Sequence, residues 1–413
     1  MEFVCRSSRL RGAVEIPGSK SHTIRAVALG ALAGGESVIE RPLVSLDALA
    51  AVRGAQALGA RVEHGNDARW VVTGVGAAPR LCSDTIDVGN SGTTLRVLMG
   101  LCAHLPEGEV ILTGDEQIQR RPAGPLAEAL NELGATVRSL RGNGCAPFAV
   151  RGRLRGGSTC VEGVTSQYVS SLLMACPLAP EPTRLTVPLL NEKPYVRMTL
   201  DWLSFLGVQV EHDDDLARFH IPGGCRYPSF RKRIPADFSS ATFFLGAGAL
   251  GENRVTCCGL DMEDSQADKA VVRYLEQLGA DVRIEGDRIT VAAENLTGRE
   301  LDLNETPDAL PVMAVLGCFA RGTTALTNVA HARIKETDRI GVMAAELRRM
   351  GARIEERPDG LVIHESALHG ARVEGHGDHR VVMALALAGL NAAGTTVVGG
   401  AGAAGVPFPD YHL

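Results

Sequence analysis

The sequence predicts a mixed α/β protein made of six similar segments, grouped into two similar globular domains. Helix starts, helix ends and short strands each recur along the whole chain at nearly constant intervals. A period longer than any single helix or hairpin is typical of a chain built from one repeated supersecondary unit. The six-fold internal repeat is therefore the feature that organises the fold.

The predicted helix starts are short polar or small turns followed by apolar helical runs. The six equivalent positions, 71–74 residues apart, are Ser21, Gly92, Ser166, Asp237, Asp308 and His379. The open N–H groups of a first helical turn and the helix dipole both favour an anion at this end of a helix. If the six starts converge, they form a site for an anionic ligand.

The predicted helix ends form a second series, in which a glycine fits the helix C-cap and leads into alternating residues that suit a half-buried strand. These glycines, 72–75 residues apart, are Gly59, Gly134, Gly207, Gly279 and Gly351. A short strand also follows each first helix, as at Ser37–Glu40 and Thr395–Val398. A sixth glycine would fall beyond the last residue, so the last repeat is complete only if the N-terminal segment supplies the missing part.

Chain length and repeat number together predict two domains, because 413 residues are too many for one ordinary core. Each repeat holds two helices and about four strands, which is a mixed α/β composition. We expect a discontinuous domain of residues 1–18 and 233–413, a second domain of residues 19–232, and the active site in the cleft between them. The charged segment from Pro228 to Pro235 is expected to be a hinge, with Pro17-Gly18 as its counterpart.

Composition argues against several classes of partner. The net charge is only -6, so nothing in the overall balance indicates nucleic acid or an anionic membrane. The ten cysteines show no zinc-site spacing and indicate reduced thiols, and no metal site is expected. No apolar run has the length of a membrane span, and the N-terminus has no apolar core of a signal peptide. We expect a cytoplasmic protein whose affinity for anions is local.

The first candidate site lies in the segment from Pro17 to Arg25. Lys20 and Ser21 stand at a helix start, and Arg25 follows about one turn later. Lysine provides a point charge for a phosphate, and arginine can bind a carboxylate or phosphate through two parallel hydrogen bonds. The spacing is not that of a Walker A loop, so nucleotide binding is not implied.

The second and third repeats carry comparable groups. Gly92 opens a helix after a turn rich in small and hydroxylated residues, and Arg121 precedes Pro122 at another helix start. Thr165, Ser166 and Gln167 offer two hydroxyls and an amide at a helix start. Helix capping alone accounts for one hydroxyl, not for both.

The last two repeats carry further candidate residues with charged side chains. Asp308 precedes the very apolar segment Leu310–Phe319, where a cap is its common role, although a carboxylate beside cations could also be a general base. The run Arg333–Arg339 holds five charges in seven residues, which usually indicates a solvated face with ion pairs. Its position matches that of Arg121, and this favours a functional role. Asp378-His379-Arg380 opens the sixth main helix.

In their order and spacing these motifs resemble the family of 5-enolpyruvylshikimate-3-phosphate synthases, the enolpyruvyl transferases of the shikimate pathway. The resemblance covers essentially the whole chain and includes Gly18-Ser19-Lys20-Ser21, Gly89-Asn90-Ser91-Gly92-Thr93, Arg121-Pro122, Lys193-Pro194-Tyr195, Lys335-Glu336-Thr337-Asp338-Arg339, Asp378-His379-Arg380 and Pro409-Asp410-Tyr411. It implies two domains of three βαβαββ units each, similar to inside-out α/β barrels, that close over the substrates. It also implies a monomer without metal or organic cofactor, whose partners are two small molecules, shikimate 3-phosphate and phosphoenolpyruvate.

The resemblance further implies a role for individual residues. The residues expected to bind shikimate 3-phosphate are Lys20, Ser21, Arg25, Thr165, Ser166, Gln167, Tyr195, Asp308, His331 and Lys335. The residues expected to bind phosphoenolpyruvate are Lys20, Gly92, Arg121, Gln167, Arg339 and Arg380. Proton transfers in both directions need acid and base groups, and the candidates are Asp308, Glu336 and Lys20, with His379 in support.

The chain departs from the family pattern at several positions. Val406 and Pro407 stand where many members have a lysine that reaches phosphoenolpyruvate, so one cationic contact is missing. Glu192 stands where a serine often helps to bind the phosphate, and its charge would oppose that binding. Thr165 replaces the usual serine but keeps the hydroxyl, and His331 occupies a position often held by asparagine.

Three other functions stay open on the sequence. The sister family, UDP-N-acetylglucosamine enolpyruvyl transferase, has an asparagine where Ser21 stands and a reactive cysteine in the loop that here runs from Gly114 to Arg120 without one. A paralogue that binds an anionic ligand without turnover would fit the missing lysine and Glu192. An enolpyruvyl transferase acting on another hydroxylated acid is the third alternative.

Overall fold

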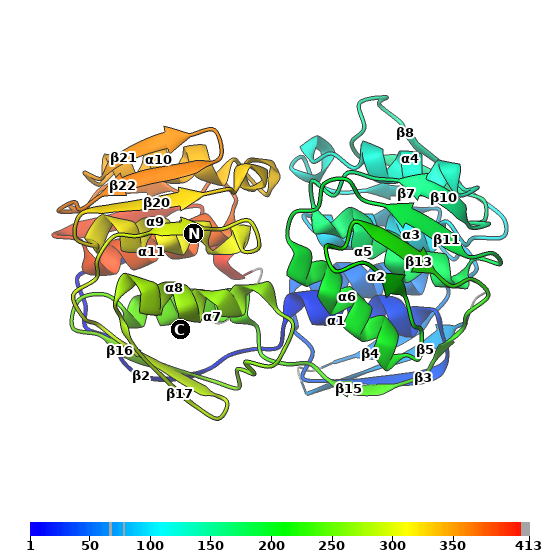
Figure 1. The fold of residues 1–413 in the computed structure, drawn as a ribbon, viewed down its shortest axis with the longest axis horizontal. Coiled ribbons are helices and arrows are strands. Elements are labelled where there is room, and N and C mark those ends of the chain that lie inside the picture. Colours follow the sequence, from blue (N-terminus) through cyan, green and yellow to red (C-terminus); the bar gives the residue numbers. More distant parts are fainter. Residues whose placement is uncertain (66–67, 77–78, 406–413) are drawn as a thin grey trace. The chain divides into compact units, whose positions relative to one another are not determined.

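The computed structural model describes residues 1–65, 68–76 and 79–405. The chain divides into two compact units (Figure 1). Unit 1 comprises Met1–Pro17 together with the chain from Pro235 onward, and unit 2 comprises Gly18–Ile234. Unit 1 is therefore discontinuous in the sequence.

Unit 2 contains three repeats, each with two helices and one sheet. The first repeat has α1 (Lys20–Ala31), β3 (Ala33–Glu40), α2 (Leu46–Ala57), β4 (Arg61–His64) and β5 (Arg69–Val75). The second has β6 (Thr85–Asp87), α3 (Gly92–Cys102), β7 (Val110–Thr113), η1 (Ile118–Arg120), α4 (Gly124–Glu132), β8 (Thr136–Ser139) and β9 (Phe148–Arg151). The third has β10 (Gly157–Cys160), α5 (Ser166–Ala175), η2 (Cys176–Leu178), β11 (Thr183–Thr186), α6 (Lys193–Phe205), β12 (Glu211–His212) and β13 (Arg218–Ile221), and the unit ends with β14 (Tyr227–Pro228) and β15 (Arg231–Arg233).

The first two repeats of unit 1 have the same order of elements, and its last repeat has one α-helix among the described residues. Unit 1 begins with β1 (Phe3–Arg6) and β2 (Arg11–Glu15) and resumes with α7 (Phe238–Gly248), β16 (Arg254–Cys258), η3 (Ala267–Lys269), α8 (Ala270–Leu278), β17 (Asp281–Glu285) and β18 (Arg288–Ala292). The next repeat has β19 (Glu300–Asp302), η4 (Pro307–Ala309), α9 (Leu310–Phe319), β20 (Thr323–Thr327), η5 (Ala330–Ile334), α10 (Arg339–Arg349), β21 (Arg353–Arg357) and β22 (Gly360–His364). The last has β23 (Arg372–Glu374), α11 (His379–Asn391), β24 (Thr395–Gly399) and η6 (Ala401–Gly405).

Five of the six described sheets share one pairing scheme: a first strand runs parallel to a second, as β6 does to β7, and two further strands are added antiparallel, as β9 and β8 are. The sixth sheet, of β23, β24 and β1, has one parallel and one antiparallel pair. In the four described sheets whose parallel strands follow each other in the chain, as β6 and β7 do, the first helix of the repeat provides the crossover connection that a parallel pair requires. In the sixth sheet β1 pairs with β24, with Phe3 opposite Val398, so the N-terminal segment completes the last repeat as expected.

The segment expected to be a hinge is partly a strand. β15 pairs in parallel with β3, with Lys232 opposite Ile39, and the N–H of Ile234 donates to the carbonyl of Glu40 at 2.8 Å. An edge strand has unpaired N–H and C=O groups that can accept such an addition. The chain is therefore fastened to unit 2 up to Ile234.

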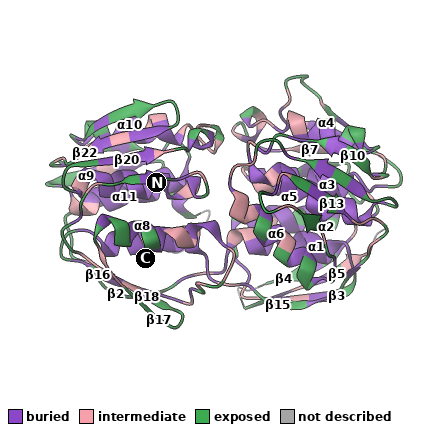
Figure 2. Ribbon diagram, viewed as in Figure 1, coloured by how far each residue is buried: buried purple, intermediate pink, exposed green. Residues whose placement is uncertain are grey.

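The first helix of each repeat is the buried one (Figure 2). α1, α3 and α5 in unit 2 and α7, α9 and α11 in unit 1 are buried along nearly their whole length, whereas the second helices expose one face. α9 consists entirely of apolar residues and glycine, and a helix that is apolar on all sides belongs in a core. α7, α9 and α11 contact one another, as do α1 with α3 and α3 with α5. These helices form the centre of each unit, and several candidate residues, including Ser21, Gly92, Ser166 and Arg380, lie at their N-termini.

The predicted helix ends are confirmed. Gly59, Gly134, Gly207, Gly279 and Gly351 all have positive φ, from 80° to 103°. A helix often ends with one residue in the left-handed region, which glycine adopts without steric cost. The predicted helix starts are also confirmed, with one difference: Asp308 lies in the single turn η4, which precedes α9. Such short turns are common at helix N-termini.

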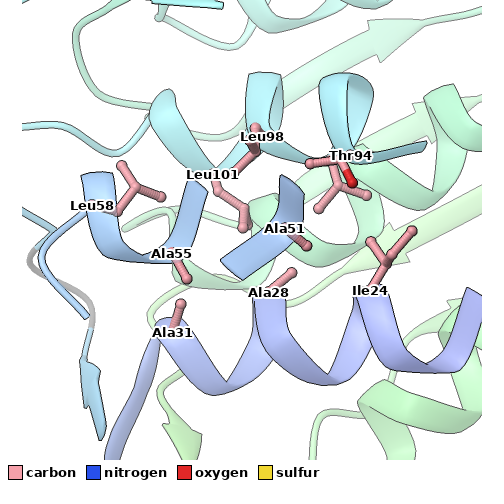
Figure 3. Close-up of a pocket in the computed structure, with 10 residues that line it drawn as sticks. Ile24, Ala28, Ala31, Ala51, Ala55, Leu58, Thr94, Leu98 and Leu101 are labelled. Atoms are coloured by element: carbon pink, nitrogen blue, oxygen red, sulfur yellow. The ribbon is translucent and has the colours of Figure 1, made fainter. Parts of the chain in front are cut away.

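A small cavity of about 10 Å³ lies between α1, α2 and α3 (Figure 3). Its lining is apolar apart from Thr94, whose hydroxyl is already bonded to Ser91 and to the carbonyl of Asp47. A buried water needs two to four polar partners, which this lining does not provide. The cavity is therefore a packing defect and not a ligand site. Among the described helices, none has the length and apolar character needed to cross a membrane.

Candidate active site

Arg339 is the centre of a buried cluster in unit 1. Its side chain is 0% exposed, and it is the first residue of α10, after the N-cap Asp338. Its guanidinium contacts three carboxylates: Nη1 lies 2.6 Å from Asp308, Nη2 lies 2.5 Å from Glu336, and Nε lies 2.7 Å from Asp378. The planar guanidinium presents its donors at Nε, Nη1 and Nη2 in fixed directions, one toward each carboxylate. The cluster joins the starts of α9, α10 and α11.

Charges in this cluster set the protonation of its members. Burial alone would raise the pKa of Asp308, but Arg380, Arg339 and Lys335 together hold that pKa well below its usual value. Burial alone would lower the pKa of Arg339, but Asp378, Glu336 and Asp308 raise it well above its usual value. Asp308 is therefore ionised at neutral pH and accepts protons poorly while both arginines hold it.

Arg380, the second residue of α11, is the other cation on Asp308. Its Nη2 lies 2.7 Å from Oδ2 of Asp308 and donates to the hydroxyl of Ser239 at 2.6 Å. Its Nη1 donates to Nε2 of His379. Because arginine has no acceptor, Nε2 of His379 is the acceptor of this hydrogen bond. His379 thus orients Arg380.

The remaining predicted residues of unit 1 lie near this cluster. Lys335 is the half-buried residue that follows η5, and it is close enough to Asp308 to lower the pKa of that carboxyl. His331 is buried within η5. Within the described ranges, no group of histidine, cysteine and carboxylate side chains is arranged to hold a metal.

In unit 2, Gly92 and Arg121 lie directly against each other. A Cβ on Gly92 would lie 2.7 Å from Cζ and Nη2 of Arg121, closer than real Cβ atoms approach. The absence of a side chain at Gly92 therefore lets the buried guanidinium lie against the start of α3. The amide of Gln167 bridges α5 and α3: Oε1 accepts from Arg96 at 2.6 Å, and Nε2 donates to Thr93 at 3.0 Å.

At the start of α1, Lys20 and Ser21 are half-buried, whereas Arg25 is 3% exposed. Arg25 donates to the hydroxyl of Thr199 at 2.9 Å, to the carbonyl of Ser21 at 3.1 Å and to the carbonyl of Tyr195 at 3.0 Å. Burial lowers the pKa of Arg25 to about 10, so the side chain stays charged at neutral pH. Much of its hydrogen-bonding capacity is thus engaged inside unit 2, where it holds α1 to the first turn of α6.

The start of α5 already holds an anionic side chain. Thr165 and Ser166 are buried, and their hydroxyls donate to Oε2 of Glu192 at 3.2 and 2.7 Å. Glu192 is the N-cap of α6, and Tyr195 is half-buried in the first turn of that helix. The two hydroxyls expected to bind the substrate are therefore bonded to a carboxylate in this structure.

Sequence reasoning missed two members of the unit 1 cluster. Asp378 caps α11 through the N–H of Arg380 at 2.8 Å and also binds Arg339, and Ser239 binds Arg380. The N-cap position of Asp378 in the sixth repeat was the available signal, whereas nothing local indicated Ser239. Val406, Pro407 and Pro409-Asp410-Tyr411 lie outside the described residues.

Six α/β repeats in two units, with cations and carboxylates gathered at helix starts, define a mixed α/β repeat protein with a buried cluster of charged side chains. A family model described as EPSP synthase (3-phosphoshikimate 1-carboxyvinyltransferase) matches residues 4–413. The chain therefore belongs to the EPSP synthase family.

Individual relatives agree with this assignment. The 3-phosphoshikimate 1-carboxyvinyltransferase of Acetivibrio thermocellus is 53% identical over 406 residues, which cover 98% of this chain and 95% of the relative. The enzyme of the same name from Methanococcus aeolicus is 39% identical over 420 residues, covering 100% of this chain and 97% of the relative. A solved structure of EPSP synthase from Acinetobacter baumannii superposes with a TM-score of 0.82 at 26% identity, covering 99% of this chain and 96% of that one.

Proposed function

We propose that this chain transfers the enolpyruvyl group of phosphoenolpyruvate to the 5-hydroxyl of shikimate 3-phosphate and releases phosphate. The observation that carries the proposal is the pair of buried guanidinium groups of Arg339 and Arg380 that meet on Asp308, in a member of the EPSP synthase family. Phosphoenolpyruvate carries a carboxylate and a phosphate, so it needs fixed cations. The 5-hydroxyl of shikimate 3-phosphate must lose its proton, so it needs a nearby carboxylate as a base.

The phosphoenolpyruvate contacts are assigned to arginines that are already held in place. Arg339 and Arg380 provide two guanidinium groups in unit 1, and Arg121 provides a third against Gly92 in unit 2. Arginine binds a carboxylate or phosphate in a bidentate way and cannot lose its charge, which suits this role. Gln167 and Lys20 complete the assigned set.

The contacts to shikimate 3-phosphate are assigned mainly to the starts of α1, α5 and α6. The assigned residues are Lys20, Ser21, Thr165, Ser166, Gln167 and Tyr195, with His331, Lys335 and Asp308 from unit 1. The internal bonds of Arg25 make it a positioning residue, which holds Ser21 and Tyr195 through their carbonyl groups.

The reaction forms one carbon–oxygen bond and breaks another. The 5-hydroxyl oxygen adds to C2 of phosphoenolpyruvate while the methylene carbon gains a proton, and the methyl group later returns a proton as the bond to the phosphate oxygen breaks. Asp308, Glu336 and Lys20 are the acid and base candidates. His379 supports the reaction by orienting Arg380.

Substrate binding itself would make Asp308 a better base. Without ligand, Arg380 and Arg339 hold the pKa of Asp308 well below its usual value, against the opposing effect of burial. When the anionic groups of phosphoenolpyruvate bind the two arginines, Asp308 loses part of this stabilisation and its pKa rises. A base is most effective when its pKa lies near the working pH. Binding of phosphoenolpyruvate therefore prepares Asp308 to remove the proton from the 5-hydroxyl of shikimate 3-phosphate.

The test is the release of inorganic phosphate from phosphoenolpyruvate in the presence of shikimate 3-phosphate. We expect turnover with shikimate 3-phosphate and none with UDP-N-acetylglucosamine. Binding of shikimate 3-phosphate without turnover would contradict the proposal and favour a silent paralogue, and turnover only with another hydroxylated acid would contradict the assigned substrate.

We also propose that the protein works as a cytoplasmic monomer without a nucleic-acid partner. All ten cysteines are free, which suits a reducing compartment, and the net charge of -6 does not favour nucleic acid. Sedimentation velocity at several concentrations tests the oligomeric state. A mass that increases with concentration would contradict a monomer.

A further inference from the structure

The carboxylate of Glu192 occupies the anion-favouring end of α5. Its side chain is buried, with the residue only 2% exposed, and Oε2 accepts three hydrogen bonds. The donors are the N–H of Ser166 at 3.0 Å, the hydroxyl of Ser166 at 2.7 Å and the hydroxyl of Thr165 at 3.2 Å. Backbone N–H and hydroxyl groups at a helix start are also the donors that a phosphate oxygen prefers.

These donors cannot serve two anions at once. Each hydroxyl and each N–H has one proton to donate, and all three protons point at the same carboxylate oxygen. A phosphate placed at the same spot would also meet the negative charge of Glu192 at close range in a buried setting, where like charges repel strongly. The side chain therefore has to leave before a phosphate can take these bonds.

The main chain around Glu192 favours a movement of the side chain alone. The N–H of Asn191 donates to the carbonyl of Gly163 at 3.0 Å, its amide donates to Val164 at 3.2 Å, and the N–H of Tyr195 donates to the carbonyl of Glu192 at 3.0 Å. Glu192 itself has φ 57° and ψ 41°, a left-handed conformation that is uncommon for glutamate. Such conformations persist where the surroundings fix them, and they cluster at functional sites.

We propose that Glu192 is an internal competitor for the phosphate of shikimate 3-phosphate. It satisfies the donors of Thr165 and Ser166 in the ligand-free protein, and it swings out of the start of α5 when the substrate's phosphate enters. Glu192 is then a specificity-determining residue, because an anion enters only if its other contacts offset the loss of three hydrogen bonds. The inference depends on the function proposed above.

The main test compares the binding of shikimate 3-phosphate to the wild type and to Glu192→Ser, measured by titration calorimetry without phosphoenolpyruvate. Removing the competitor frees three donors, so we expect the Kd for shikimate 3-phosphate to fall by about tenfold or more. Glu192→Gln keeps the size and an acceptor oxygen but loses the charge, so we expect a smaller decrease.

Asp215→Asn is the matched control. The Asp215 side chain is 91% exposed, and it lies 4.0 Å from Nζ of Lys193, the residue next to Glu192. The control removes one negative charge from this region without changing a residue of α5, so we expect the Kd to change less than twofold, because an exposed, solvent-screened charge has little effect.

Thermal unfolding provides an independent readout. Without ligand, Glu192→Ser should unfold at a lower temperature than the wild type, because buried donors lose their acceptor. Inorganic phosphate should then raise its midpoint more than that of the wild type, since a ligand that binds the native state stabilises it.

An unchanged or higher Kd in both Glu192→Ser and Glu192→Gln would overturn the inference, as would a decrease of equal size in Asp215→Asn. Absence of binding by the wild type and all variants would overturn it too. Tighter binding by Glu192→Ser in a protein without turnover would support the inference while contradicting the proposed function, so the two failures are distinguishable.

Discussion

Replacing Arg339 by methionine should test the central cluster of unit 1 most directly. The substitution keeps an unbranched side chain of similar length but removes the only guanidinium that contacts Asp308, Glu336 and Asp378 together in the described chain. Three carboxylates would remain close together, with Arg380 still on Asp308. We expect phosphate release to fall below detection, because a proposed substrate contact and the cluster geometry are both lost.

The size of the stability effect follows from burial. The Arg339 side chain is 0% exposed, and removing one partner of a buried ion pair costs about 3–5 kcal/mol. With three carboxylates affected, we expect about 5 kcal/mol, a large share of the about 5–15 kcal/mol that stabilises a typical protein. Arg339→Lys keeps the charge, but a single ammonium group cannot replace donors at Nε, Nη1 and Nη2, so we expect about half that loss.

The unfolding free energy that Arg339→Met loses should depend on pH, and the direction of that dependence follows from the pKa of Asp308. Burial opposes the ionisation of Asp308, yet Arg380 and Arg339 hold its pKa well below the usual value. A group with a lowered pKa contributes stability above its unfolded pKa of about 4, and this contribution is lost as the pH falls toward the folded pKa. The difference between wild type and Arg339→Met should therefore be largest near pH 7 and smaller near about pH 3.

Urea unfolding followed by circular dichroism measures these differences. Arg283→Met is the control in the same unit, because Arg283 forms an ion pair with Asp281 with 59% of its own side chain exposed. The control should change the unfolding free energy by about 0–1 kcal/mol. A loss in Arg339→Met no larger than in the control, or a loss that grows as the pH falls, would refute the reasoning.

Three further predictions follow from the geometry. Gly92→Ala places a Cβ 2.7 Å from the guanidinium of Arg121 and should displace it with the fold intact, so we expect a higher KM for phosphoenolpyruvate in steady-state kinetics. An unchanged KM would contradict the proposed contact between Arg121 and phosphoenolpyruvate. Leu98→Ala enlarges the cavity between α1, α2 and α3 and should lower the free energy of unfolding by about 2–5 kcal/mol, measured by urea unfolding followed by tryptophan fluorescence. A decrease below about 1 kcal/mol would show that the surrounding side chains fill the space. Asp308→Asn removes the carboxylate proposed as a base and should lower kcat by about 10²–10⁴-fold in steady-state kinetics, and near-normal turnover would remove Asp308 from the chemistry.

Most of the fold could be predicted because its signals are local. Gly59 and the four equivalent glycines end their helices, since a left-handed residue at that position depends only on the adjacent turn. The apolar run Leu310–Phe319 forms a central helix because it has no polar face to expose. The completion of the last repeat by Phe3–Arg6 could be inferred only from counting the repeats.

The contacts within the candidate site were less predictable. The sequence indicated that Asp308, Glu336, Arg339 and Arg380 belong to functional segments, but not that both arginines bind Asp308 and so lower its pKa. It indicated an unfavourable charge at Glu192, but not a carboxylate bonded within the site.

The sequence by itself determined the repeat, the helix boundaries and the residue types at each helix start, because periodicity, caps and turns act over a few neighbouring residues. Only the tertiary structure decided which carboxylate meets which arginine, that Ser239 supports Arg380 across 141 residues of chain, and that Glu192 lies on the donors of Thr165 and Ser166. These pairings depend on how the packed helices bring distant segments within hydrogen-bond distance, and no local pattern encodes such distances.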